Sequence, residues 1–190
     1  MARHARQRWF VKAAVVALLA CAAYLGLVGL MGPLGLVGRA QALPTRTLGK
    51  EPGVRVPIPE GFDPDGKRTN GRLETLLLTD GTDVALVTVY RATDASRAPA
   101  AAAALRAHAE ELGKTLGADE HLGSARIAGR DVPARSFEYK RSGAGWHAVV
   151  VALDAGDTIG RLTIVAVWVA VAGGPGEREL ASVVAAIEIK

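Results

Sequence analysis

Residues 162–171 have the sequence LTIVAVWVAV, which is apolar at every position except Thr163. A strand with one solvated face alternates apolar and polar residues, whereas a strand covered on both faces is apolar throughout. The glycine-rich segment at residues 173–176 then breaks the chain. We therefore predict that residues 160–171 form a central strand of a sheet that is covered on both faces.

Three further strands are predicted just before this one, at residues 125–127, 132–140 and 146–153. Short segments with glycine separate the four strands, at residues 129–131, 142–145 and 154–157. Parallel neighbours need a crossover of roughly a dozen residues. These short links therefore predict that the four strands are antiparallel neighbours.

The N-terminal half is predicted to hold three strands and a helix. The strands are predicted at residues 54–59, 72–78 and 84–90, and the first is an edge strand because its prolines cannot donate to a ladder. The helix is predicted over residues 100–112, where alanines give high helix propensity and Ser96 is placed to cap the start.

A last helix is predicted over residues 177–187, because Leu180, Val183, Val184 and Ile187 recur at helical spacing. The predicted order is βββαββββα. The predicted class is α+β, an antiparallel sheet with helices packed against it.

Several segments resemble the PsbP/Mog1-like superfamily. They are the opening Ile58-Pro59-Glu60-Gly61-Phe62, a hairpin, a helix, IAGRDVPA at residues 127–134 leading into a strand, two long strands and a closing helix. The resemblance covers residues 53–190. It implies this same α+β fold and an accessory or binding role, since the superfamily includes bacterial lipoproteins and anchored proteins and brings no shared catalytic motif.

Residues 13–38 form one uncharged apolar stretch, preceded by Arg3, Arg6, Arg8 and Lys12 and by no acid. About 20 apolar residues span a bilayer as a helix, and a basic flank stays in the cytoplasm. We predict a cytoplasmic tail at residues 1–12, a transmembrane signal anchor at 13–38, a tether at 39–52 and an extracytoplasmic domain at 53–190. The richness in Ala, Arg and Gly is typical of a GC-rich bacterium, so the predicted location is the bacterial inner membrane, in a single pass.

Two other fates of this segment stay open. The small-x-small site Ala40-Gln41-Ala42 is suited to signal-peptide cleavage after Ala42. Leu18-Leu19-Ala20-Cys21 resembles a bacterial lipobox, although an apolar run rather than a polar tether follows Cys21.

The charge distribution argues against nucleic-acid binding. Four of the 23 Lys and Arg precede the apolar run, and the remaining 19 balance the 19 Asp and Glu that follow it. Nucleic-acid recognition uses a clustered basic face, which this neutral domain lacks. We therefore expect no nucleic-acid partner.

Two segments partly match known ligand loops. Asp63, Asp65 and Glu74 have calcium-loop spacing, but Lys67 takes a ligand position and Arg68 replaces the required glycine. We predict an Asx-type turn before a strand there. Residues 173–176 precede a helix as a phosphate loop does, but without the Lys-Ser/Thr of that motif, so we predict an ordinary strand-to-helix connection.

No pattern indicates catalysis. His108, expected on a helix surface, His121 and His147 are dispersed, and no His-Glu-x-x-His or Gly-x-Ser-x-Gly motif occurs. The adjacent acids at residues 110–111 and 119–120 are typical of a solvated face. We predict that the domain is not an enzyme and holds no metal or cofactor.

The aromatic residues of the sheet are the candidate binding residues. Trp146, Trp168 and Tyr139 lie on predicted strands, where large aromatics build the core or line a groove. We expect a non-catalytic domain that binds a protein partner or serves as an accessory subunit of an envelope complex. The alternative is a module that binds a small molecule or lipid in a sheet–helix crevice.

Overall fold

The computed structural model describes residues 43–49, 53–70, 73–92, 99–155 and 161–190. Its strands are β1 (Thr45–Leu48), β2 (Val54–Pro57), β3 (Asp63–Asn70), β4 (Leu73–Thr79), β5 (Val84–Ala92), β6 (Glu120–Ile127), β7 (Arg130–Arg141), β8 (Ala144–Asp154), β9 (Arg161–Val171) and β10 (Glu188–Ile189). The helices are α2 (Ala101–Leu116) and α3 (Pro175–Ala185). No helix in this part of the chain is long and apolar enough to cross a membrane, and the predicted tail and anchor lie outside it.

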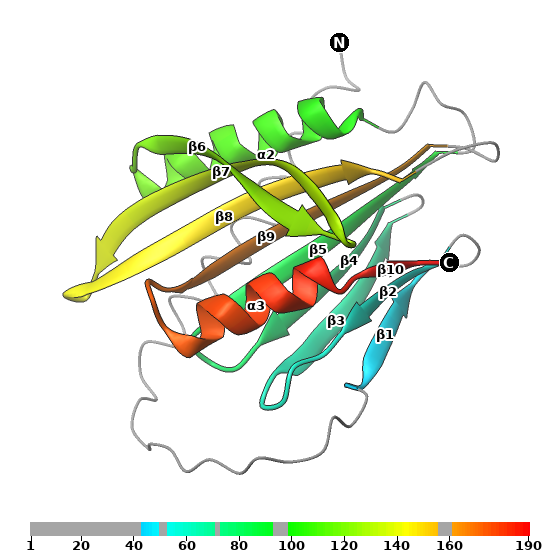
Figure 1. The fold of residues 1–190 in the computed structure, drawn as a ribbon, viewed down its shortest axis with the longest axis horizontal. Coiled ribbons are helices and arrows are strands. Elements are labelled where there is room, and N and C mark those ends of the chain that lie inside the picture. The colour runs from blue at the N-terminus through cyan, green and yellow to red at the C-terminus, as the bar shows by residue number, and fades with distance from the viewer. Residues whose placement is uncertain (1–42, 50–52, 71–72, 93–98, 156–160) are drawn as a thin grey trace.

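The strand with the LTIVAVWVAV sequence lies at the centre of a seven-stranded antiparallel sheet, as predicted. The sheet has the order β3-β4-β5-β9-β8-β7-β6, so three strands lie on each side of β9 (Figure 1). Every residue from Leu162 to Ala170 is buried. The α+β class and the antiparallel hairpins of β6, β7, β8 and β9 are confirmed.

Alternate residues of β9 belong to two separate cores. Ile164, Ala166 and Trp168 lie in the core on the α3 side, whereas Val165 and Val167 lie in the core on the α2 side. A strand directs successive side chains to opposite faces, so one uninterrupted apolar run supplies both cores.

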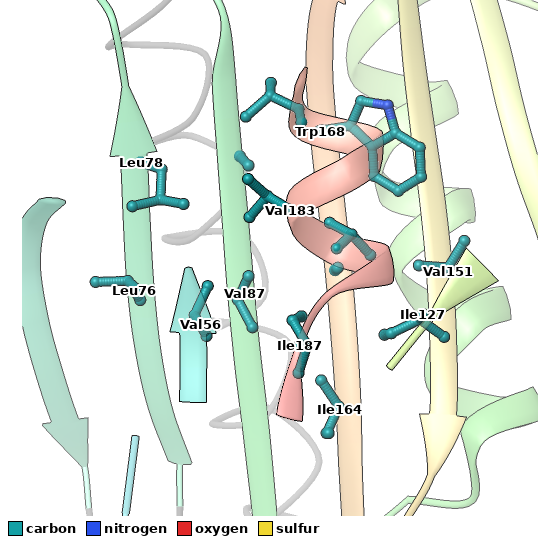
Figure 2. Packing of buried hydrophobic residues seen from close by; sticks show 14 of the residues in the cluster. Val56, Leu76, Leu78, Val87, Ile127, Val151, Ile164, Trp168, Val183 and Ile187 are labelled. Carbon is teal, nitrogen blue, oxygen red and sulfur yellow. The ribbon is translucent and has the colours of Figure 1, made fainter. Parts of the chain in front are cut away.

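The core on the α3 side is closed by α3 together with the three-stranded sheet β1-β2-β10. Figure 2 shows Val183 from α3, Ile187 from the segment after it, Val56 from β2 and Ile127 from β6 in the same core as Ile164. At roughly 25 cal/mol per Å² of apolar surface, such burial is the main stabilising term of the fold.

The core on the α2 side is closed by one alanine-rich helix that packs on β7, β8 and β9. Ala104, Leu105, Ala109 and Leu112 form its buried stripe. Small side chains let the helix approach the sheet closely, and Phe137 of β7 fills the space beneath the helix beside Gly113.

The predicted strand order is wrong in the N-terminal half, where five strands precede α2. Residues 45–48, inside the predicted tether, form β1 by pairing with β2, and β10 pairs with the other side of β2. The strand predicted at an edge because of its prolines is therefore the central strand of the three-stranded sheet. The predicted Asx-type turn at Asp63 is instead the start of β3. Pairing with β4 overrides its turn propensity, and a register shift between Asp65 and Arg68 absorbs the irregularity.

The start of α2 is capped by a side chain from the end of strand β8. Its N-cap residue Ala100 makes no side-chain bond to the helix, and the predicted cap Ser96 lies outside the described residues. The carboxylate of Asp154, at the end of β8, accepts a hydrogen bond from the Ala101 N–H at 3.0 Å. An anionic acceptor at this end also suits the helix dipole.

Candidate binding surface at the β7–β8 hairpin

The hairpin of β7 and β8 extends beyond β6. The pairing of β6 with β7 stops at Glu120↔Phe137, whereas the pairing of β7 with β8 continues to Arg141↔Ala144. The turn residues Ser142 and Gly143 have φ values of 51° and 83°, and positive φ at both central residues is what a type I′ hairpin turn requires. In Figure 1 the tip of this hairpin lies beyond the end of α2.

Three side chains form a continuous surface on this extension. Tyr139 and Trp146 face each other across the two strands and stack, with ring centroids 6.4 Å apart and an interplanar angle of 28°. The guanidinium carbon of Arg141 lies 5.6 Å from the centroid of the Trp146 ring, which is the geometry of a cation–π contact. All three side chains are partly exposed. We call Tyr139, Arg141 and Trp146 the hairpin surface.

Burial affects two polar groups of the hairpin surface, the Tyr139 phenol and the Trp146 Nε1. Burial raises the pKa of Tyr139, and the nearby charge of Arg141 opposes part of that rise, so the phenol stays protonated at neutral pH. The Trp146 Nε1 is covered and has no hydrogen-bond partner among the described residues.

The third predicted aromatic lies on the other face of the sheet. Trp168 is only 4 % exposed and pairs with Val149, on the face that α3 covers. The structure therefore brings Tyr139 and Trp146 together and separates Trp168 from them. The separation follows from strand parity, because Trp146 pairs with Val171, whose parity in β9 is opposite to that of Trp168.

His108 is buried rather than on a helix surface, which corrects the prediction. It is 3 % exposed, and its Nε2 lies 2.8 Å from the hydroxyl of Tyr90 on β5. Burial lowers the pKa of His108 to about 4 and raises that of Tyr90 to about 12. Both groups are thus neutral at pH 7, and the pair joins α2 to the sheet by a neutral hydrogen bond.

His147 pairs with Glu177 at the start of α3. The Nδ1 of His147 lies 2.5 Å from one carboxylate oxygen of Glu177, and the other oxygen accepts a bond from the Gly173 N–H at 2.7 Å. Burial alone would raise the pKa of Glu177, but the hydrogen bonds from His147 and Gly173 and the charges of His147 and Arg178 together outweigh burial and lower it. Glu177 therefore binds the start of α3 to β8.

Asp83 occupies the space beside the same helix end, a role that the sequence did not indicate. Its Oδ1 accepts a bond from the Val171 N–H at 3.0 Å, and a Cβ placed on Gly176 would lie 1.7 Å from its Oδ2. Burial and the nearby acids Asp80, Glu179 and Glu177 raise the pKa of Asp83 to about 6, against the lowering by the Val171 bond. An internal carboxylate thus lies at the glycine-rich connection, consistent with an ordinary strand-to-helix connection there.

The residues of the partial calcium loop have structural positions. Glu74 is buried, and its carboxylate accepts a bond from the Gly49 N–H at 2.6 Å, which ties the end of β1 to β4. In the two pairs of adjacent acids at residues 110–111 and 119–120, Glu110 pairs with Lys114 and Glu120 pairs with Arg135. Within the described ranges, no group of three or more His, Cys, Asp or Glu side chains is arranged to hold a metal ion.

These observations define the described chain as an α+β protein built on a seven-stranded and a three-stranded antiparallel sheet, with a partly exposed aromatic hairpin that extends beyond the edge strand β6. No known family model matches the chain, and no curated protein matches it in sequence. A solved structure similar to it is that of LpqN, described as involved in cell envelope biogenesis of Mycobacterium tuberculosis. The two are 11 % identical, the match covers 77 % of this chain and 91 % of that one, and the TM-score is 0.47. A likeness this distant bears on neither site nor function.

Proposed function

We propose that this protein is a non-catalytic, membrane-anchored binding domain that engages a protein partner of the bacterial cell envelope through the hairpin surface. The observation that carries the proposal is the stacked pair Tyr139 and Trp146 with Arg141 over the indole. Tyr, Trp and Arg are the residue types that dominate binding energy in protein interfaces. Here all three meet on one partly exposed extension.

The hairpin is also suited to binding because strand pairing and core packing hold its aromatic side chains in place. Its strands pair in register as far as Arg141↔Ala144, and Trp146 and Tyr139 pack on the α2-side core. Side chains that are ordered before binding lose less conformational entropy on association. A prearranged aromatic surface is therefore more effective than the same residues on a loose loop.

The apolar side chains that pack under both helices favour this proposal over the alternative of ligand binding in a sheet–helix crevice. In the described residues, the interface under α3 is packed with Leu180, Val183 and Val184, and that under α2 with Leu105 and Leu112. A ligand crevice is a concave apolar volume of a few hundred cubic ångströms. The resemblance to the PsbP/Mog1-like superfamily and the anchor at residues 13–38 stay predictions, and both are consistent with a partner in or near the membrane.

The test is co-purification of the tagged full-length chain from its native membranes in mild detergent, read by mass spectrometry. We expect a partner in stoichiometric amount with the wild-type chain. Arg141→Glu reverses the charge beside Trp146 and is expected to reduce the recovered partner by about 10-fold or more, the loss typical of an interface hot spot. Trp146→Ala should act in the same direction.

The matched control is Arg178→Glu, the same charge reversal at an exposed position on α3. It should retain the partner at the wild-type level. Near-ultraviolet circular dichroism checks that each variant keeps its packed core. A wild-type chain that purifies alone, or a partner that Arg141→Glu retains in full, would contradict the proposal.

A further inference from the structure

The two edge strands of the seven-stranded sheet differ in their protection. At one edge, β3 carries Pro64, which has no N–H, and its register shifts between Asp65 and Arg68. Prolines and bulges on an edge strand prevent pairing with another chain. At the other edge, β6 pairs with β7 in unbroken register from Glu120↔Phe137 to Ile127↔Arg130 and contains no proline.

The unprotected edge is also exposed and partly apolar. Residues 120–124 of β6 are all exposed, and among the described strands β6 has β7 as its single neighbour. Leu122 is 74 % exposed, the larger fraction of the two exposed large apolar side chains in the described residues. An edge strand with unbroken register, no proline and an exposed leucine is a template for the addition of another strand.

The charges of β6 are arranged symmetrically about Gly123. In an antiparallel pair of two β6 strands centred on this glycine, Glu120 of each copy lies opposite Arg126 of the other, and Leu122 lies opposite Ser124. Opposite charges directly across a strand pair are favourable. Within one chain Glu120 already bonds Arg135 at 2.7 Å and Arg126 bonds Asp131 at 3.1 Å. The pairing would join these two ion pairs into one alternating row of charges.

The same register accounts for the exposed leucine. Strand parity places Leu122 on the same face of the sheet as Glu120 and Arg126. In a pair centred on Gly123, the two copies of Leu122 become diagonal neighbours on that face, within reach of contact between large side chains. Each leucine would then cover the other.

We propose that β6 is a self-association edge, through which two copies of this chain pair antiparallel about Gly123 and continue the sheet from one copy into the next. The occupant is a second copy because the charge pattern is complementary to itself under a twofold axis. Most soluble homo-oligomers have such closed symmetry. The surface is distinct from the hairpin surface, so the proposal does not depend on the proposed function.

Disulfide cross-linking tests the register. In the proposed pair the two Gly123 Cα atoms lie about 4.5–5.5 Å apart, which is within the span of a disulfide. A Cβ on Gly123 meets no atom within 4 Å, and its φ is not in the left-handed region, so Gly123→Cys is compatible with the fold. We expect mild oxidation of membranes with full-length Gly123→Cys to yield a disulfide-linked dimer as the main species.

The neighbouring variant Ser124→Cys is the matched control. Its two copies would be offset by two residues along the strands, too far apart for a disulfide. We expect it to cross-link at least about 10-fold less, at the background that the wild-type chain shows through its native Cys21. Equal cross-linking of the two variants, or none with Gly123→Cys, would overturn the proposed pairing.

The mass of the full-length chain in detergent gives an independent measurement. Light scattering should show two chains per particle, and Leu122→Lys should raise the dissociation constant by about 10-fold or more, since charge at an edge strand blocks pairing. The control Leu43→Lys changes the other exposed leucine, which is 47 % exposed and lies outside β6. It should leave the dimer intact. A wild-type chain that stays monomeric over the whole concentration range, or equal effects of both lysines, would refute self-association through β6.

Discussion

The two faces of the central sheet bury ionisable groups of opposite kind. On the α3 side, Asp83 lies buried against Gly176, and burial raises its pKa to about 6. On the α2 side, His108 lies buried against Tyr90, and burial lowers its pKa to about 4. The same physical cause acts on both faces, since a poorly solvated site disfavours the charged form of either group.

The consequence is that the two faces respond to acid in opposite directions. Where the folded pKa of an acid is raised, the folded state binds more protons and acid stabilises the fold. Where the folded pKa of a histidine is lowered, the unfolded state binds more protons and acid destabilises the fold. The pH range over which stability changes is about 3.8 to 6 for Asp83 and about 4 to 6.5 for His108, so the two effects partly cancel in the wild-type chain. Variants on one face at a time separate them.

The largest effect is expected from Gly176→Ala on the α3 face. The new Cβ would lie 1.7 Å from the Oδ2 of Asp83 and 3.2 Å from its Cβ, so the whole side chain must move. Overpacking and loss of the bond to the Val171 N–H together lower the unfolding free energy by about 3–4 kcal/mol. Urea unfolding of the full-length chain in mild detergent, followed by tryptophan fluorescence, measures it.

The matched glycine on the α2 face is Gly113. Its added Cβ would lie 2.9 Å from the Cε1 of Phe137, at the edge of the ring. Replacing a helical glycine by alanine gains about 0.5–1 kcal/mol, which offsets a small shift of the ring. Gly113→Ala should therefore change stability by less than about 1 kcal/mol, and equal losses at the two glycines would break the comparison.

The second prediction concerns His108 on the α2 face. Its pKa is about 4 in the folded chain against 6.5 in the unfolded one, so its contribution to stability is present above pH 6.5 and is lost as the pH falls toward 4. This loss amounts to about 3 kcal/mol. His108→Gln keeps a hydrogen-bonding side chain but does not titrate. The unfolding free energy of the variant should therefore fall less than that of the wild type between pH 6.5 and 4, and parallel pH profiles would contradict the buried state of His108.

The third prediction, Asp83→Asn, tests the α3 face. The pKa of Asp83 is about 6 in the folded chain against 3.8 in the unfolded one, so ionised Asp83 destabilises the fold above pH 6 and the penalty disappears as the pH falls toward 3.8. Asparagine retains the acceptor for the Val171 N–H and carries no charge. After allowance for solvent screening, it should raise the unfolding free energy at pH 7.5 by about 1–2 kcal/mol. The exposed control Asp119→Asn should change it little, and a loss of stability with Asp83→Asn would show that the charged form is favoured.

The regular part of the fold could be predicted because its pattern is local. The apolar run of β9 and the glycine turns between β6 and β9 carry their own periodicity, and α2 carries its alanines. β1, β3 and β10 could not be predicted in this way. β10 takes its strand conformation from pairing with a distant segment, Ile189 with Val54. β1 and β3 pair with the strands that follow them, and the propensity of Asp-Pro-Asp-Gly for a turn gives way to the pairing of β3 with β4.

The candidate site was predictable in part for the same reason. Tyr139 and Trp146 occur on two strands joined by a short glycine turn, so their meeting follows from hairpin register once the turn is known. Strand parity places Trp168 on the opposite face of the sheet from Trp146. Parity can be read from the sequence, but it assigns the face only once the strand register is known. The burial of His108 had a local signal, because it lies three residues after Leu105 and four before Leu112 on the buried stripe of α2. The burial of Asp83 had none, because α3 covers it from far away in the chain.

The smallest effect concerns how the two helices end. α2 ends at its own glycine, Gly117, whose φ is 61° and whose N–H bonds the Gly113 carbonyl. α3 has no such glycine, and its last carbonyls on Val184 and Ala185 accept bonds from the N–H groups of Ala128 and Gly129 in the turn between β6 and β7.

Ala128 carries out this capping with a φ of 49°, a conformation that glycine adopts without penalty and alanine does not. Ala128→Gly should therefore raise the unfolding free energy by about 0.5–1 kcal/mol. The control is Ala125→Gly, three residues earlier in β6 and outside the left-handed region, where the same change should lower stability by a similar amount. The opposite signs distinguish relief of the turn from a general effect of glycine, and a loss at both positions would show that the positive φ of Ala128 carries no strain.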